Sequence, residues 1–296
     1  MLEFKELEIT DKDLVNRYLE KCGRRNCESN FSTIFNWGGA LGTKLALTEG
    51  TLLLSFERNG DVLFYPPLGE HVNKAVQQTI DYAKQQGKGL QFVTLSEAMA
   101  GELCEEFPEF SSECNEDDSD YVYLAEKLQT LSGKKLHGKR NHISRFEKTY
   151  AYEFSLIGPA DYDACLEINY EWCRQNGSCA SESAQNELCA IRRCFANFEQ
   201  LDVTGGILRV DGKPIAFTVG SRLYPGSDTY NIHFEKALDG YEGAYPAINK
   251  YFANTLPENI VFINREEDMG VPGLRKAKQS YRPEFLEPKY RLRYRG

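Results

Sequence analysis

The sequence predicts an α/β (α+β) fold of two tandem modules, each with a mixed, mainly antiparallel sheet flanked by helices. The first observation is a hairpin: the strand-forming residues 51–57 and 62–65 are separated by Asn59-Gly60, a pair typical of two-residue turns. A helical pattern over 73–86 ends at glycine and leads into a strand over 90–94. The first half therefore has the order hairpin, turn, helix, strand.

The second observation is that the same order recurs in the second half. Its expected elements are a strand over 206–210, a turn at Asp211-Gly212, strands over 214–222 and 228–235, a helix over 245–256 and a strand over 259–264. Sequence identity between the halves is negligible, so the repeat is one of pattern only. It favours a duplicated α/β module over a single continuous mixed sheet, which stays the alternative.

The segments between the halves predict a domain boundary. Residues 111–120 are acidic with few apolar side chains, so we expect an exposed loop there. The helical stretch 127–150 is expected to bridge the modules. We therefore place an N-terminal module at 1–130 and a C-terminal module, which includes this basic bridging helix, at 131–296.

The remaining segments complete the pattern of helices and strands. An opening helix is expected from Thr10 to a stop at Gly23, and two more helices over 161–176 and 181–199. The tail 288–295 alternates tyrosine or leucine with arginine. This period of two predicts a strand with one basic face.

Composition excludes several classes of protein. With 296 residues, of which 41% are hydrophobic, the chain can bury a substantial core. The net charge of −9 argues against a general nucleic-acid binder, and we expect no DNA partner. No apolar run approaches the ~18 residues of a membrane span, and the N-terminus is charged, so we expect no transmembrane segment and a cytoplasmic location. The nine cysteines form no CxxC pair, so we expect no metal site.

Positive charge is concentrated in two segments. Residues 134–148 carry six lysines and arginines, and residues 275–295 carry eight more. Together they hold 14 of the 35 basic residues, so the rest of the chain is strongly acidic. A local basic face for an anionic substrate is compatible with this distribution.

Polar side chains follow the strand 259–264, at the edge of a sheet where such folds bind ligands. Glu266 and Asp268 are the first candidate catalytic residues, because clustered carboxylates can raise one another's pKa and supply a general base. Asn264, at the strand end, is a candidate substrate-binding residue. A solvated turn held by salt bridges is the alternative.

Cations are expected to approach the same edge. Arg275 and Lys278 lie one turn apart on a basic helix, where they can hold a phosphate or carboxylate of the substrate. Lys139 and Arg140 on the bridging helix are further substrate-binding candidates. A solvated basic face is the alternative for both pairs.

Two further residues are candidate catalysts. His233 and Glu235 alternate along one strand, which predicts that both point to the same side and can relay a proton or bind substrate. Tyr245, at the start of the helix that follows, is a candidate general acid. A structural histidine and a packed tyrosine are the alternatives.

The segments HFEKALDGYEGAYPAINKYFA (233–253), INREEDMGVPGLRKAKQSYRPEFLEPKY (263–290) and GKKLHGKRNHISRFEKTY (133–150) resemble a known family. They are similar to soluble relatives of the C-terminal domain of phosphatidylglycerol lysyltransferase. The resemblance covers nearly the whole chain. It implies two tandem acyltransferase-like folds of the Gcn5-related N-acetyltransferase (GNAT) type.

The resemblance also implies acyl or aminoacyl transfer from an activated carbonyl to an amine or hydroxyl. In that fold a turn after the fourth strand binds the pyrophosphate of coenzyme A; here it corresponds to Asp239 to Ala244, with Gly243 and Ala244 as cofactor-binding candidates. The turn lacks the basic or glutamine-rich start usual in coenzyme A users. Acyl-CoA and aminoacyl-tRNA therefore both stay open as donor co-substrates.

We therefore expect an acyltransferase or aminoacyltransferase. Its partners would be an anionic donor, with aminoacyl-tRNA one candidate, and a small-molecule, peptide or lipid acceptor that carries an amine or hydroxyl. The alternative is a non-catalytic ligand-binding or sensor module that keeps the fold and uses its cleft for an anionic or amino-acid ligand.

Overall fold

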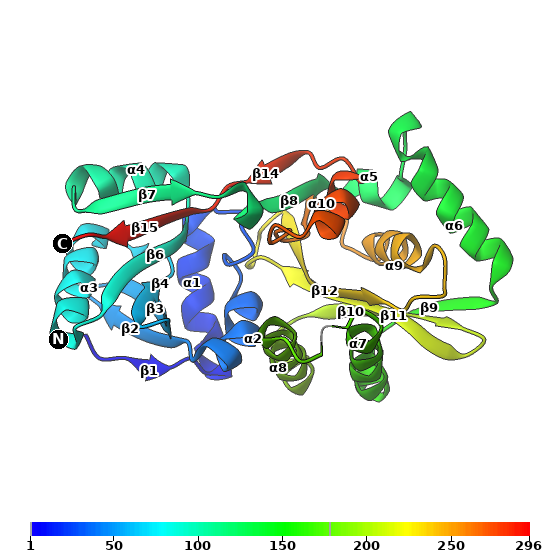
Figure 1. Cartoon of the computed structure of the whole chain (residues 1–296), viewed down its shortest axis with the longest axis horizontal. Helices are drawn as coiled ribbons and strands as arrows, with labels where there is room; N and C mark the ends of the chain where they lie inside the picture. Colours follow the sequence, from blue (N-terminus) through cyan, green and yellow to red (C-terminus); the bar gives the residue numbers. More distant parts are fainter. Residues whose placement is uncertain (1, 178) are drawn as a thin grey trace.

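The molecule consists of two mixed sheets that lie side by side, each covered by helices (Figure 1). The structure is a computed structural model that describes residues 2–177 and 179–296. No helix within these ranges combines the length and the apolar composition that crossing a membrane requires.

The first sheet contains strands from both ends of the chain. Its order is β1-β2-β3-β4-β6-β15-β7, and β5 pairs with β3. The strands are β1 (Lys5–Glu6), β2 (Lys44–Thr48), β3 (Thr51–Arg58), β4 (Asp61–Phe64), β5 (Leu68–Gly69), β6 (Gly89–Leu95), β7 (Phe110–Cys114) and β15 (Tyr290–Tyr294).

The second sheet has the order β14-β8-β13-β12-β11-β10-β9. Its strands are β8 (Asp120–Leu124), β9 (Tyr152–Leu156), β10 (Thr204–Val210), β11 (Lys213–Arg222), β12 (Thr229–Ala237), β13 (Phe262–Asn264) and β14 (Phe285–Glu287).

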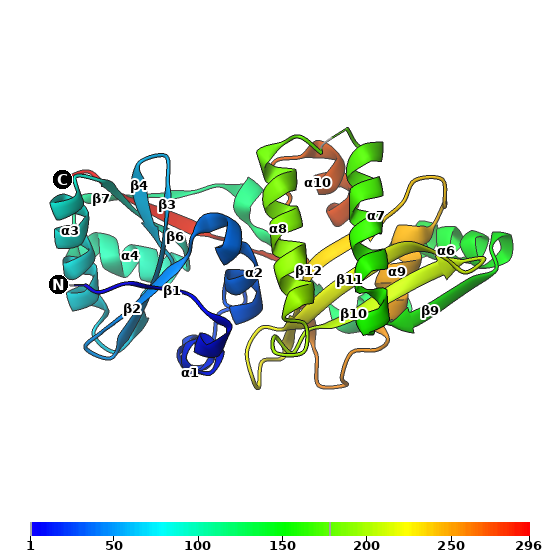
Figure 2. The same cartoon turned by 90° about the horizontal axis from the view of Figure 1, so that it is seen from below.

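The helices cover both faces of both sheets (Figures 1 and 2). The first half contributes α1 (Lys12–Cys22), α2 (Phe31–Leu41), α3 (Val72–Gln86) and α4 (Glu97–Glu106). The second half contributes α5 (Ala125–Thr130), α6 (His137–Thr149), α7 (Tyr162–Gln175), α8 (Glu182–Ala196), α9 (Ala244–Ala253) and α10 (Pro272–Gln279).

Each half contains the predicted order of hairpin, helix and strand. In the first, β3 and β4 form the hairpin and α3 leads to β6, which pairs parallel with β4. In the second, β11 and β12 form the hairpin and α9 leads to β13, which pairs parallel with β12. The other pairs in both sheets are antiparallel, so the prediction of mixed, mainly antiparallel sheets is confirmed.

Local sequence explains two of the tight turns. Asn59 and Gly60, between β3 and β4, have φ of 54° and 87°. Asp211 and Gly212, between β10 and β11, have φ of 50° and 78°. Two consecutive positive φ angles match the twist of a hairpin, and glycine, asparagine and aspartate adopt them at the lowest cost.

The two halves exchange strands. The chain passes from β7 in the first sheet to β8 in the second, and returns from β14 in the second sheet to β15 in the first. Both crossings lie away from the boundary that we expect near residue 130. The strand over 120–124 belongs to the second sheet, and the tail over 290–294 belongs to the first.

Two expectations for the segments between the halves were wrong. Part of the acidic segment 111–120 is strand β7, because its partner β15 comes from the far end of the chain and its polar side chains face solvent at the sheet edge. Helix α6 does not bridge the halves; it packs against α9 on the second half, beyond both crossings (Figure 1).

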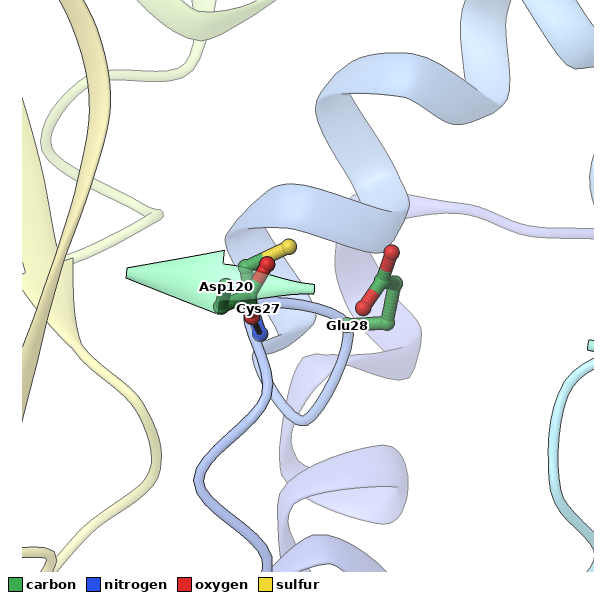
Figure 3. A group of neighbouring side chains, drawn as sticks. All are labelled: Cys27, Glu28 and Asp120. Atoms are coloured by element: carbon green, nitrogen blue, oxygen red, sulfur yellow. Dashed lines mark hydrogen bonds between the residues drawn. The ribbon is translucent and has the colours of Figure 1, made fainter. Parts of the chain in front are cut away.

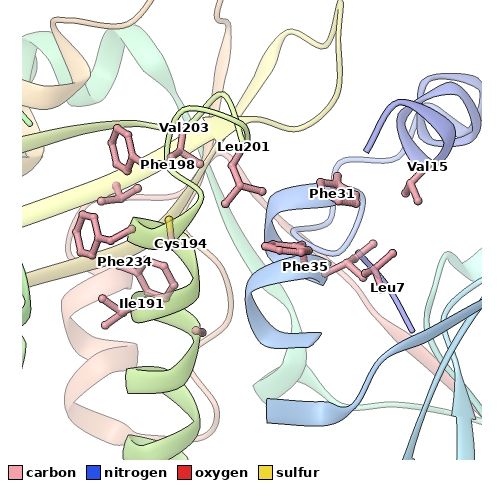
Figure 4. Packing of buried hydrophobic residues seen from close by; sticks show 14 of the residues in the cluster. Leu7, Val15, Phe31, Phe35, Ile191, Cys194, Phe198, Leu201, Val203 and Phe234 are labelled. Carbon is pink, nitrogen blue, oxygen red and sulfur yellow. The ribbon is translucent and has the colours of Figure 1, made fainter. Parts of the chain in front are cut away.

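One apolar core joins the halves. Val15 of α1 and Phe31 of α2 belong to the same buried cluster as Ile191 of α8 and Phe234 of β12 (Figure 4). Helices α2 and α8 pack directly together, with the Arg193 guanidinium 3.9 Å from the centre of the Phe35 ring. This shared core holds the two sheets in a defined relation, which positions residues from both halves around the site.

We expect Leu292→Ala to destabilise the first half more than a neighbouring surface change. Leu292 is fully buried in β15 between β6 and β7, so truncation leaves a cavity that lowers the free energy of unfolding by about 2–5 kcal/mol. Arg293→Ala, which removes an exposed pair with Glu113, is the control and should change it by less than about 1 kcal/mol. Urea unfolding measures both; equal effects would contradict the insertion of β15.

Candidate functional site

The two chain crossings run side by side and form the centre of the site. Asp120 is the first residue of β8 and pairs across the sheet with Glu287, the last residue of β14. Lys289 follows within the second crossing, just before β15. Asp120 and Lys289 therefore lie where both segments leave one sheet for the other.

Lys289 is a buried ammonium surrounded by anions. Its Nζ lies 2.7 Å from Asp120 Oδ1. It also lies 2.9 Å from Glu28 Oε1 and 3.0 Å from Glu267 Oε2. The side chains of Lys289 and Asp120 are 5% and 0% exposed. Burial alone would lower the pKa of Lys289, but attraction to these anions raises it well above its ordinary value, so the lysine stays charged.

One group of side chains has the residue types of a metal site: Cys27, Glu28 and Asp120. Their ligand atoms lie within 4.8 Å of one another (Figure 3). The ammonium of Lys289 contacts both carboxylates and donates to Cys27 Sγ at 3.2 Å. Burial raises the pKa of the Cys27 thiol well above its ordinary value, which disfavours the thiolate that metals prefer. The lysine is thus the cation that these groups hold.

Asn264 connects the end of β13 to the first half. Its Nδ2 donates to Asp120 Oδ2 at 2.9 Å and to the Arg25 carbonyl at 2.8 Å. Its Oδ1 accepts from the Glu266 backbone N–H at 2.7 Å. These contacts fully engage the amide, so its structural role is to shape the turn that carries the acids.

Of the two predicted catalytic carboxylates, Glu266 and Asp268, that of Glu266 makes fewer hydrogen bonds. Glu266 is half-buried, its backbone has a φ of 58°, and Oε1 accepts from Asn231 Nδ2 at 3.0 Å. A positive φ is strained for glutamate and is often retained at functional sites. Burial, followed by repulsion from Glu267, raises the pKa of Glu266 well above its ordinary value of 4.5.

Asp268 and Arg275 meet as predicted, but they saturate each other. Arg275 Nε and Nη2 donate to the two carboxylate oxygens of Asp268 at 2.7 and 2.8 Å. Asp268 also accepts from Tyr121 Oη at 2.6 Å, and Arg275 also pairs with Asp117. Hydrogen bonds from Arg275 lower the pKa of Asp268, so this carboxylate is a poor base.

The remaining predicted cations are also engaged with the protein. Lys278 Nζ donates to the backbone carbonyls of Arg265, Glu266 and Glu267, and so closes the acidic turn. Lys139 Nζ lies 4.0 Å from the centre of the Tyr281 ring, and burial lowers its pKa to about 8.

Arg140 binds at the start of its own helix. It donates to the Leu131 carbonyl and, at 2.8 Å, to the Gly133 carbonyl. It therefore supports the turn before α6, and the structure does not bring it to Glu266.

The prediction that His233 and Glu235 point to the same side was wrong. A register shift between β11 and β12 pairs Val219 with Phe234 but Gly220 with Ile232, so His233 is the extra residue of a β-bulge. The bulge reverses the alternation of side chains. Glu235 consequently binds Arg265 at 2.7 Å and faces α9.

His233 faces α2 and the first half instead. Its Nε2 lies 2.8 Å from Ser221 Oγ. Its Nδ1 lies 3.3 Å from Thr33 Oγ1 and 3.2 Å from Asn231 Nδ2. Burial lowers the pKa of His233 to about 3, so the imidazole is neutral near pH 7.

Tyr245, Gly243 and Ala244 form a separate group at the start of α9. Gly243 has a φ of 93°, and a Cβ there would lie 2.6 Å from the carbonyl oxygen of His142 in α6. Ala244 is buried, and burial raises the pKa of Tyr245 to about 12. Helix α6 therefore packs directly on the turn that the sequence suggests for cofactor binding.

A cleft of about 380 Å³ lies at the junction of the halves. Asn16 and Phe31 line it from the first half; Ser221, Leu223 and Tyr230 line it from the second. None of the twelve predicted site residues lines this cleft, although His233 lies directly behind Ser221.

Sequence reasoning missed Asp120, Lys289, Glu28, Asn231 and Ser221. One local signal was present: Lys289 is the single lysine in a short segment between two strands. The others depend on contacts between segments up to 261 residues apart, which periodicity does not reveal.

The sequence and the structure of the chain are similar to those of proteins with acyltransferase-like folds. Residues 19–293 match the family described as phosphatidylglycerol lysyltransferase, C-terminal. A protein of unknown function from Bacteroides thetaiotaomicron is 36% identical, with 99% of this chain and 100% of that chain covered and a TM-score of 0.93.

Two more distant structures share the fold. L-PGS from Bacillus licheniformis is 15% identical, with 97% and 92% coverage and a TM-score of 0.69. A tandem GNAT protein from the clavulanic acid pathway is 9% identical, with 100% and 99% coverage and a TM-score of 0.54. The predicted fold of tandem acyltransferase-like modules is thus confirmed.

A curated relative matches only part of the chain. An uncharacterized protein of Mycoplasmoides gallisepticum is 26% identical over 179 residues, which are 60% of this chain and 56% of the relative. The match thus spans about half the length of that relative.

We expect Lys289→Met to lower the free energy of unfolding by about 3–5 kcal/mol, because Asp120 then remains buried without its counter-ion. Lys127→Met, which removes a half-exposed pair with Glu284, is the control and should cost about 0–1 kcal/mol. Chemical denaturation of both variants tests the difference, and a Lys289 variant as stable as the control would refute the role of this ion pair.

Proposed function

The chain belongs to the family of the phosphatidylglycerol lysyltransferase C-terminal domain, and from this premise we propose that it transfers an activated aminoacyl or acyl group to an amine or hydroxyl acceptor. The family and the fold support transfer chemistry in general. The contacts of the individual residues support more specific roles.

The state of Glu266 is the observation that carries the proposal. An acceptor amine is protonated near pH 7 and must lose a proton before it attacks a carbonyl. Within the described residues, Asn231 is the one side chain that hydrogen-bonds the Glu266 carboxylate, whereas Arg275 and Tyr121 saturate Asp268. The raised pKa of Glu266 brings the carboxylate closer to the basicity that this step needs. We assign Glu266 as the general base.

The neighbouring acids support an acceptor that carries positive charge. Glu267 lies next to Glu266 in the turn and binds the ammonium of Lys289, which also contacts Glu28 and Asp120. Repulsion between the two carboxylates is a cause of the raised pKa of Glu266. An incoming ammonium group would relieve that repulsion, which favours an amine over a neutral alcohol at this turn.

The turn at Gly243 favours aminoacyl-tRNA over acyl-CoA as the donor. A pyrophosphate bound there would need free backbone N–H groups at the start of α9. The His142 carbonyl of α6 lies against Gly243, and the neighbouring Glu242 carboxylate is paired with Arg145. The packed carbonyl opposes a phosphate group at this position.

Helix α6 offers a surface for the phosphates of a tRNA. Lys134 and Lys135 are exposed just before it, and Arg145 and Lys148 are exposed along it. The chain has a net charge of −9, so this local basic surface is distinct from the rest of the molecule.

A ligand-binding module without catalysis is the second candidate function. It is favoured by the engagement of Arg275, Lys278 and Arg140 in contacts within the protein, which leaves them unable to hold a substrate without rearrangement. Absence of transfer from the wild type would favour this candidate, whereas transfer by the wild type would exclude it.

We expect Glu266→Gln to lower the rate of transfer about 10²–10⁴-fold, because the amide cannot accept the proton. The wild-type rate should rise with pH through the raised pKa of Glu266, since only the carboxylate is basic, and the variant should lack this rise. The assay follows radiolabelled aminoacyl groups from bulk aminoacyl-tRNA into product in the presence of primary amines. Exposed Glu258→Gln is the matched control; equal rates for the two variants would exclude the role of Glu266.

We expect the double variant Lys134→Ala/Lys135→Ala to bind bulk tRNA more weakly. Each lost phosphate contact should reduce the slope of log affinity against log salt by about 0.7–0.9. Filter binding at several salt concentrations measures the slope. The exposed pair Lys21→Ala/Lys44→Ala on the first half is the control, and an effect of the same size there would argue against α6.

A further inference from the structure

The ammonium group of Lys139 is half-buried and has no counter-ion. Its Nζ lies 4.0 Å from the centre of the Tyr281 ring, and the Arg265 guanidinium lies 4.9 Å from the centre of the same ring. In the part of the chain that the structure describes, this ammonium forms no hydrogen bond and no salt bridge. The lysines at the acidic turn differ, because Lys278 and Lys289 are more deeply buried and both bind oxygen atoms of the protein. The transfer proposal gives Lys139 no role.

The charges around Lys139 favour the loss of its proton. It is the third residue of α6, where the positive end of the helix dipole disfavours a cation, and residues 131–146 contain no acid. Arg265, directly after β13, adds a second cation on the same ring. The Glu235 carboxylate of β12 attracts the lysine, but it is already bound by Arg265 at 2.7 Å and by Asn249 Nδ2 at 3.3 Å.

These surroundings make the amine of Lys139 a nucleophile. Burial, followed by repulsion from Arg265, lowers the pKa of Lys139 to about 8. A lysine that is partly removed from water, or that lies beside a second cation, is activated in this way, because more of its amine is neutral near pH 7. The phenols of Tyr281 and Tyr123, which pack around Arg265, stay neutral in the same range, because burial raises the pKa of both.

The surface around this lysine favours a reagent that carries negative charge. Lys134 and Lys135 are exposed just before α6, and Lys139 keeps part of its own surface exposed. A positive surface raises the local concentration of anions. Acyl phosphates combine negative charge with an activated carbonyl carbon, which a neutral amine can attack. The charge distribution therefore favours acyl phosphates over neutral esters as the source of an acyl group.

We propose that Lys139 is a modification site that takes the acyl group of small acyl phosphates. The neutral Nζ forms a bond to the acyl carbonyl carbon, and the bond from that carbon to the phosphate oxygen breaks. Phosphate leaves with the electron pair of the broken bond, and the proton that Nζ loses passes to water. The product is an uncharged amide on Lys139, which ends the repulsion between this side chain and Arg265.

Acylation of Lys139 requires neither Glu266 nor a tRNA, so its outcome is independent of the transfer proposal. The test incubates the full-length chain with acetyl phosphate between about pH 6.5 and pH 9 and follows each lysine by mass spectrometry. At pH 7.5 we expect Lys139 to be acetylated at least about 10-fold faster than Lys148, which is exposed in the last turn of α6. The rate at Lys139 should rise with pH and level off above about pH 8, where the amine is mostly neutral.

Two variants separate an activated lysine from one that is merely accessible. Lys139→Arg should lose the acetyl group at this position and leave acetylation of Lys148 unchanged. Arg265→Gln should slow acetylation of Lys139, because it removes the repelling cation and frees Glu235 to bind the ammonium. Acetylation of wild-type Lys139 no faster than that of Lys148, or without levelling off near pH 8, would overturn the proposal. That comparison uses the unmodified chain, so it decides the matter even if Arg265→Gln fails to fold.

Discussion

The buried contact between Lys289 and Asp120 is the constraint on which the arrangement of this molecule depends. It joins the two segments that carry the chain between sheets, at the point where β8 begins and just before β15 begins. Burying two charges costs free energy, and the cost is recovered only where geometry and further hydrogen bonds are good. Here Asn264 and the Cys27 backbone satisfy the second Asp120 oxygen, so the pair specifies one register for both crossings.

The same constraint shapes the acidic turn. Glu267 is held by Lys289, and Lys278 binds three successive carbonyls of residues 265–267. These contacts hold the backbone so firmly that Glu266 keeps a positive φ. A glutamate held in this way, near a second carboxylate and partly removed from water, has the raised pKa that a base requires. The electrostatics of the turn thus follow from the crossing of the chain.

The bulge at His233 separates two chemical environments on one strand. On one side, Glu235 and Arg265 form an ion pair beside α9. On the other side, His233 contacts Ser221 of the neighbouring strand β11 and, across the junction, Thr33 of α2. One additional residue in β12 therefore determines that the histidine faces the junction with the first half, where the cleft lies.

Local sequence determined much of the secondary structure and the order of elements in each half. Asn59-Gly60 and Asp211-Gly212 specify tight turns. The end of the first helix at Gly23 and the alternation of side chains over 288–295 could also be predicted, because these effects act within a few residues. Local sequence also suggested that Asp268 and Arg275 meet, since opposite charges flank one turn.

The tertiary structure alone decided which of these residues remain available for chemistry. The insertion of β15 beside β7, the burial of Lys289 and the bulge at His233 depend on pairing between distant segments. Desolvation then set the charge states, because the pKa of Glu266 and of His233 responds to neighbours that fold around them from both halves. Periodicity is a local property, whereas burial and strand register are properties of the assembled chain.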